Sequence, residues 1–71
     1  MDVLDEKGLL PLAVLVRSEY LEMPGLRLTS AQAVRLLGLE PAVCARLFSH
    51  LVSSGFLRIG RDGHYVRADA A

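Results

Sequence analysis

Seventy-one residues are enough for one domain and too few for a second hydrophobic core. Hydrophobic residues make up 52% of the chain and the net charge is zero, which excludes a disordered chain of low hydrophobicity and high charge. The longest apolar run, residues 9–16, is far shorter than the roughly 20 residues that cross a bilayer.

Several functional classes are disfavoured. Asp2, Asp5 and Glu6 stand where a secretory signal would carry positive charge, so we expect a cytoplasmic protein. Cys44 is the only cysteine, and with two distant histidines it does not predict a zinc site or another metal site. Ser49 and His50 are adjacent and would point about 100° apart on a helix, so we expect neither catalysis nor a cofactor.

The charges are unevenly distributed along the chain. Residues 1–26 carry five acidic side chains against Lys7 and Arg17, whereas residues 27–67 carry six arginines against Glu40 and Asp62, a local balance of +4. A basic region of this kind is typical of nucleic-acid contact, and ordinary solvated surface is the alternative.

The first predicted helix covers residues 8–23. Pro11 suits a first helical turn, polar residues enter only in the second half, and Pro24 with Gly25 ends the helix. Residues 26–28 alternate apolar and basic side chains, which predicts a very short strand.

Two further helices are predicted. Thr29 and Gln32 have capping-box spacing for a helix over 29–37, which Gly38 closes. Pro41 opens a helix over 40–54 that Gly55 ends. Its periodicity predicts an apolar side, with Val43, Cys44, Leu47, Phe48, Leu51 and Val52, and an exposed side, with Ala42, Ala45, Arg46, Ser49, His50 and Ser53.

Residues 56–67 form a predicted hairpin. Two strand-like runs flank Gly60-Arg61-Asp62-Gly63, and Asp-Gly is a strong signal for a tight turn. Residues 68–71 show no pattern and are expected to fray.

Residues 26–67 resemble the winged helix-turn-helix of bacterial transcriptional regulators of the MarR, ArsR and IclR kinds. The resemblance rests on the cap at Thr29, the turn at Gly38-Leu39, and the run from Leu51 to Gly55-Phe56-Leu57. It implies a mostly helical domain with three helices and a two- or three-stranded wing sheet. The winged-helix fold serves both DNA binding and protein binding.

The resemblance implies a DNA-binding, transcription-regulator-like module with duplex DNA as partner. The third helix would enter the major groove and Arg46 would pair with guanine, while the second helix and the wing would contact the backbone. The residues implied are Thr29, Ser30, Gln32, Ala42, Ala45, Arg46, Ser49, His50, Arg61 and His64. Plain solvent-facing residues are the alternative for Arg46, Ser49 and His50.

The first helix has more apolar residues than one small core can hold. We expect an interface that includes Leu9, Leu10, Leu12 and Val16, used either for a homodimer or by another domain of a longer protein. Together with zero net charge and Glu40 at the start of the third helix, this surplus supports the alternative function, a protein-interaction module that does not bind nucleic acid.

Overall fold

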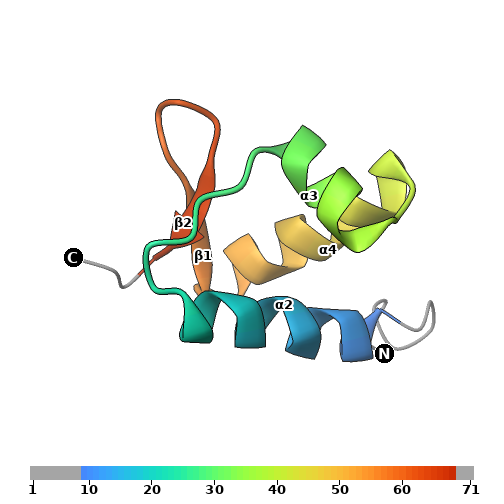
Figure 1. Cartoon of the computed structure of the whole chain (residues 1–71), viewed down its shortest axis with the longest axis horizontal. Coiled ribbons are helices and arrows are strands. Elements are labelled where there is room, and N and C mark those ends of the chain that lie inside the picture. Colours follow the sequence, from blue (N-terminus) through green and yellow to red (C-terminus); the bar gives the residue numbers. More distant parts are fainter. Residues whose placement is uncertain (1–8, 69–71) are drawn as a thin grey trace.

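Three helices and a two-stranded hairpin form residues 9–68, the part of the chain that the computed structural model describes (Figure 1). The helices are α2 (Leu10–Glu22), α3 (Ser30–Leu37) and α4 (Pro41–Ser53), and the strands are β1 (Leu57–Ile59) and β2 (Tyr65–Arg67). The predicted fold class, mostly helical with a small hairpin, is confirmed. The predicted helix start at Gly8 and the tail at residues 69–71 lie outside the described residues.

The helix boundaries follow from local chemistry. Pro11 and Pro41 lie in the first turns of α2 and α4, where a backbone N–H has no intrahelical partner to lose. α3 begins at a capping box formed by Thr29 and Gln32 and ends at Gly38, whose φ of 66° is in the left-handed region that favours glycine. The predicted ranges 29–37 and 40–54 are longer than α3 and α4 because they include capping residues.

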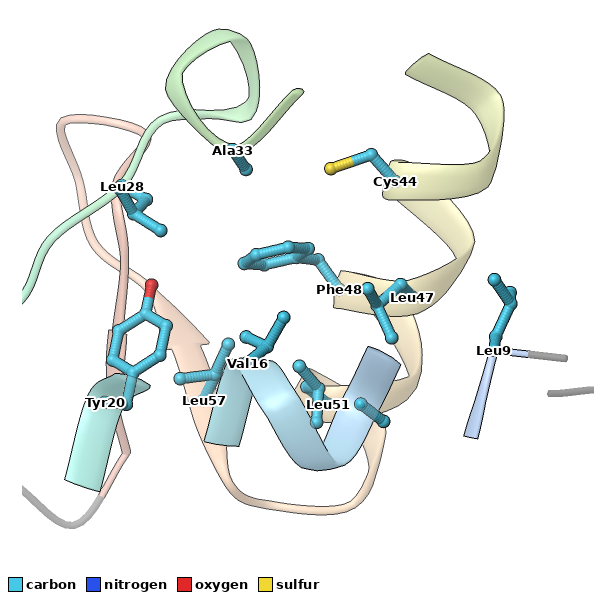
Figure 2. Close-up of a cluster of buried hydrophobic side chains, with 11 residues drawn as sticks. Leu9, Val16, Tyr20, Leu28, Ala33, Cys44, Leu47, Phe48, Leu51 and Leu57 are labelled. Atoms are coloured by element: carbon cyan, nitrogen blue, oxygen red, sulfur yellow. The ribbon is translucent and has the colours of Figure 1, made fainter. Parts of the chain in front are cut away.

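The core lies between one side of each helix and the inner side of the hairpin (Figure 2). Phe48 lies at the centre of this cluster, and its ring centroid is 4.8 Å from that of Tyr65 on β2. The buried residues of α2 and its N-cap recur every three or four positions, which places them in one stripe. The buried hydrophobic residues are Leu9, Ala13, Val16, Tyr20, Leu28, Ala33, Cys44, Leu47, Phe48, Leu51 and Leu57.

The hairpin is antiparallel, and β1 pairs with β2 in a register that places Arg58 opposite Val66. The predicted strand at 26–28 is reduced to a single bridge between Leu28 and Tyr65. The Tyr65 N–H donates to the Leu28 carbonyl over 2.7 Å, and the Leu28 N–H donates back over 3.3 Å. The segment before α3 therefore lies along the free edge of β2.

Two sequence predictions are corrected by these contacts. Leu9 and Val16 are only 4% and 2% exposed, so they belong to the core and are not available to the predicted interface. The sequence predicts that residue 68 frays, but the Ala68 N–H donates to the Phe56 carbonyl over 3.0 Å and continues the pairing of the hairpin.

The arrangement separates two sides of the domain. α2 runs along one side, and α3 and the tip of the hairpin lie on the other (Figure 1). Among residues 9–68, no helix combines the length and apolar character that a membrane crossing requires.

Candidate nucleic-acid interface

α4 has one buried and one exposed side, as its periodicity predicts. Cys44, Leu47, Phe48 and Leu51 are buried in the core that α4 shares with α2. The residues predicted to read DNA are all exposed and point away from that core: Ala42, Ala45, Arg46, Ser49 and His50. We call these five residues the α4 outer face. Two of them are alanines, so the backbone of α4 is accessible to a close partner.

The start of α3 is already occupied by its own capping contacts. The Gln32 backbone N–H donates to Thr29 Oγ1 over 3.1 Å, and the Thr29 N–H donates to Gln32 Oε1 over 2.9 Å. Both side-chain oxygens therefore serve the helix rather than a ligand. Of the three residues predicted here, Ser30 is the one whose side chain is exposed and not part of the capping box.

We call the β1–β2 hairpin the wing, and its turn, residues 60–63, is held by Asp62. The carboxylate forms an ion pair with Arg27, from the segment that precedes α3. Its Oδ1 also accepts a hydrogen bond from the His64 backbone N–H over 3.2 Å and lies 3.2 Å from His64 Nδ1. The pKa of Asp62 lies below its usual value, mainly because of the backbone N–H and with a further contribution from Arg27.

The two predicted wing residues, His64 and Arg61, differ in how far their side chains are exposed. The side chain of His64 is 27% exposed and lies against Asp62, so it supports the turn instead of pointing outward. Arg61, at the tip of the turn, is exposed, as a contact with a duplex requires.

An apolar hollow of about 330 Å³ opens between α3, α4 and β2. Its walls include Ser30 and Ala45, two of the predicted DNA-contact residues, and no charged residue lines it among the described residues. The remaining walls come mainly from apolar side chains, including Val34, Pro41 and Phe48. The hollow therefore suits an apolar group of a partner better than a phosphate.

Sequence reasoning missed the Arg27–Asp62 pair and the apolar hollow. The Asp-Gly dipeptide indicated a turn but not the partner of the carboxylate, which lies 35 residues away in the chain. The alternation in Leu26-Arg27-Leu28 did signal that Arg27 would point away from the core, because Leu28 points into it.

α3, α4 and the hairpin, which pairs with the segment ahead of α3, belong to a mostly helical domain with a small antiparallel β hairpin. No family model matches the chain, and neither a curated protein nor a solved structure matches it. Among residues 9–68, no group of three His, Cys, Asp or Glu side chains is placed to hold a metal ion.

Proposed function

We propose that this domain binds duplex DNA, with α4 in the major groove and Arg61 of the wing on the neighbouring backbone. The observation that carries the proposal is the α4 outer face, on which Arg46, Ser49 and His50 project from a helix that presents alanines at positions 42 and 45. A major groove about 12 Å wide admits a helix. Small side chains let the helix approach closely enough for Arg46 to reach a guanine edge.

Charge supports the same orientation. α2 carries Glu19 and Glu22 against Arg17, a balance of −1. α4 carries Arg46 and is preceded by Glu40, and the hairpin over residues 57–67 carries three arginines against Asp62, a balance of +2. Phosphate attraction would therefore favour an approach by α4 and the wing rather than by α2. Glu40 is exposed at the N-cap of α4 without a capping hydrogen bond, so its carboxylate would oppose a nearby phosphate. We also propose a cytoplasmic location, where the bacterial regulators that residues 26–67 resemble meet their DNA.

The proposal is tested by fluorescence anisotropy with a labelled random duplex at low salt. We expect Arg46→Ala and Arg61→Ala each to weaken binding, and Arg61→Ala also to reduce the slope of log K against log salt by about 1. Arg35→Ala, in the last turn of α3, is the matched control because it removes the same charge outside the predicted contact. Unchanged binding in both Arg46→Ala and Arg61→Ala would refute the proposal.

A second test of duplex binding uses Glu40→Gln, a substitution that is expected to raise affinity and not to lower it. Removing this carboxylate should tighten duplex binding, because the α4 N-cap then presents no negative charge to the backbone. If Glu40→Gln leaves affinity unchanged while Arg61→Ala lowers it, the duplex contacts the wing but not the start of α4.

Protein binding is the second candidate function, and the apolar hollow is the observation that favours it. An apolar side chain of a partner would fit between Val34, Pro41 and Phe48. An NMR titration with duplex DNA separates the two candidates. Salt-sensitive shifts on α4 and the wing support DNA binding, and their absence at low salt favours a protein partner.

We also propose that two copies pair through α2. Leu10, Val14 and Leu21 are exposed and follow one another at helical spacing along one side, with Val14 at 56% exposure. Pairing there leaves the α4 outer face open in both copies, and a spacing of about 34 Å would match one DNA turn. Of the predicted set, only Leu10 lies on this side. Leu12 packs against the core together with the buried Leu9 and Val16, and Val14 and Leu21 take the place of these three residues.

Sedimentation velocity over a range of concentrations tests the pairing. We expect Val14→Glu to give monomer where the unmodified chain is dimeric, and Leu36→Glu on α3, which alters an equally exposed residue, to leave the dimer intact. A monomer at all concentrations would refute the pairing and leave the other alternative, a further domain of a longer protein that covers this side of α2.

A further inference from the structure

The outer side of the wing carries a groove that shares only Arg61 with the proposed DNA contact. It lies between residues 24–27, which join α2 to α3, and the hairpin, and it encloses about 470 Å³. Its described walls hold one acidic residue, Asp62, and four basic ones, Arg27, Arg58, Arg61 and Arg67, a balance of +3. We call this surface the wing groove.

The alternation of side chains along strands explains why Arg27 and Arg58 lie on the same side of the sheet. Leu28 and Leu57 are buried, so their neighbours Arg27 and Arg58 point to the opposite, outer side of the sheet. Arg58 pairs with Val66, and the Leu28–Tyr65 bridge places Arg27 on the other flank of Val66. Two strand spacings, about 10 Å, therefore separate the Arg27 and Arg58 backbones, and Val66 forms an apolar floor between them.

The arginines of the wing groove differ in their contacts with other side chains. The Arg67 guanidinium lies 5.1 Å from the centroid of the Phe56 ring, and Arg27 is paired with Asp62. Arg58 and Arg61 are exposed, and no carboxylate other than Asp62 lines the groove in the described part of the chain. The groove therefore gathers more positive charge than its own acidic residue neutralises.

We propose that the wing groove binds the phosphoryl group of a small soluble ligand through Arg27, Arg58 and Arg61. Guanidinium groups present planar forks of N–H donors that match the oxygens of a phosphate bidentately. Three guanidinium groups from three separate segments can bind a ligand with three or more oxygens, such as a phosphate, better than a ligand with one carboxylate. The opposite side of the sheet packs on α4 through Tyr65 and Phe48, so the groove faces away from that helix.

Asp62 competes with an anionic ligand for Arg27. Its carboxylate is ionised at neutral pH and holds Arg27 in the absence of a ligand. A bound phosphoryl group would take Arg27 from Asp62 and gain the charge-assisted hydrogen bonds that the carboxylate gives up. Removing the negative charge at position 62 should therefore strengthen anion binding, whereas removing Arg58 should weaken it.

The test is an NMR titration of the whole chain with inorganic phosphate and with pyrophosphate at constant ionic strength. We expect saturable shifts at Arg58, Arg61 and Gly63, with the α4 outer face unchanged. Arg58→Gln should weaken binding about tenfold, and Asp62→Asn should tighten it by about threefold or more. Asn keeps an oxygen that can accept from the His64 N–H, so this variant preserves the turn.

Glu40→Gln is the matched control for charge. Both Glu40→Gln and Asp62→Asn remove one negative charge. Glu40 lies at the start of α4, outside the wing groove. If both variants bind phosphate equally more tightly, or if the shifts rise linearly without saturation, the effect is nonspecific electrostatic attraction. Either result would overturn the proposal. A thermal melt of each variant confirms that the fold is retained.

A duplex titration of the same variants separates this site from the proposed DNA contact. Arg58→Gln should leave duplex affinity close to that of the unmodified chain, and Arg46→Ala should leave phosphate affinity unchanged. If Arg58 responds to the duplex and not to inorganic phosphate or pyrophosphate, the wing groove belongs to the duplex contact and the small-ligand site is refuted.

Discussion

The hydroxyl of Tyr20 donates a hydrogen bond to the backbone carbonyl of Tyr65 over 2.8 Å and thereby ties α2 to the second strand of the wing. The same carbonyl accepts the N–H of Leu28, so α2, the segment before α3 and β2 meet at one oxygen. Tyr20 is fully buried, and this bond satisfies the one polar atom of its side chain.

Tyr20→Phe should lower the free energy of unfolding by about 1 kcal/mol, because it removes the hydrogen bond and leaves the Tyr65 carbonyl with the Leu28 N–H alone. Urea denaturation followed by circular dichroism at neutral pH measures the change. Tyr65→Phe is the matched control, since it deletes a phenolic oxygen but keeps the backbone carbonyl. Equal losses in the two variants would show that the bond itself contributes nothing.

Stability should also fall at alkaline pH, because the buried Tyr20 hydroxyl ionises less readily in the folded chain than in the unfolded one. Burial raises the pKa of Tyr20 from 10.0 to about 12, with a smaller contribution from Tyr65. The unfolded chain ionises this group first, so its contribution to stability is complete below pH 10 and is lost as the pH rises toward 12. Denaturation across this range should show a steeper loss for the unmodified chain than for Tyr20→Phe. Parallel curves would contradict the assignment.

Phe48 should be the most sensitive position of the core. Phe48→Ala is expected to cost about 3–5 kcal/mol, because it opens a cavity at the centre of the cluster and removes the ring contact with Tyr65. Leu36→Ala, at a residue that is 58% exposed, should change stability by less than about 0.5 kcal/mol. Thermal unfolding compares them, and Phe48→Leu provides a milder variant if Phe48→Ala does not fold. Similar effects at positions 36 and 48 would mean that the core is elsewhere.

Two glycines should respond differently to the same substitution. Gly38→Ala should destabilise the domain by about 1 kcal/mol, because alanine is strained at the φ of 66° that closes α3. Gly25 has no positive φ, and a Cβ there would meet no atom within 4 Å. Gly25→Ala should therefore be neutral or slightly stabilising. Chemical denaturation of both variants tests this, and a loss at Gly25 as large as that at Gly38 would disprove it.

The capping box at α3 gives a further test. Thr29→Ala should lower stability by about 1 kcal/mol, because the Gln32 N–H loses its acceptor. Thr29→Ser keeps the hydroxyl oxygen and should retain most of the stability. Hydrogen exchange at the Gln32 amide reports the same contact locally, and protection that survives in Thr29→Ala would argue against the cap.

Much of this structure was predictable because its signals are local. The cap at Thr29, the ends at Gly38 and Pro41, and the two sides of α4 depend on residues within a few positions of each other. The short strand was a weak point because its pairing is not local. The three residues Leu26-Arg27-Leu28 could not distinguish a strand from the single bridge that Leu28 makes, since the bridge partner is Tyr65 on β2.

The sequence by itself determined where the helices begin and end, which side of α4 is exposed, and where the hairpin turns, because neighbouring residues carry that information. Only the tertiary structure decided which apolar stripe of α2 is buried. That helix is apolar on several sides, and the positions of α4 and Leu57 select Val16 for the core and leave Val14 outside. The meeting of Arg27 with Asp62 also required the folded chain, since pairing along β2 brings together charges that are distant in sequence.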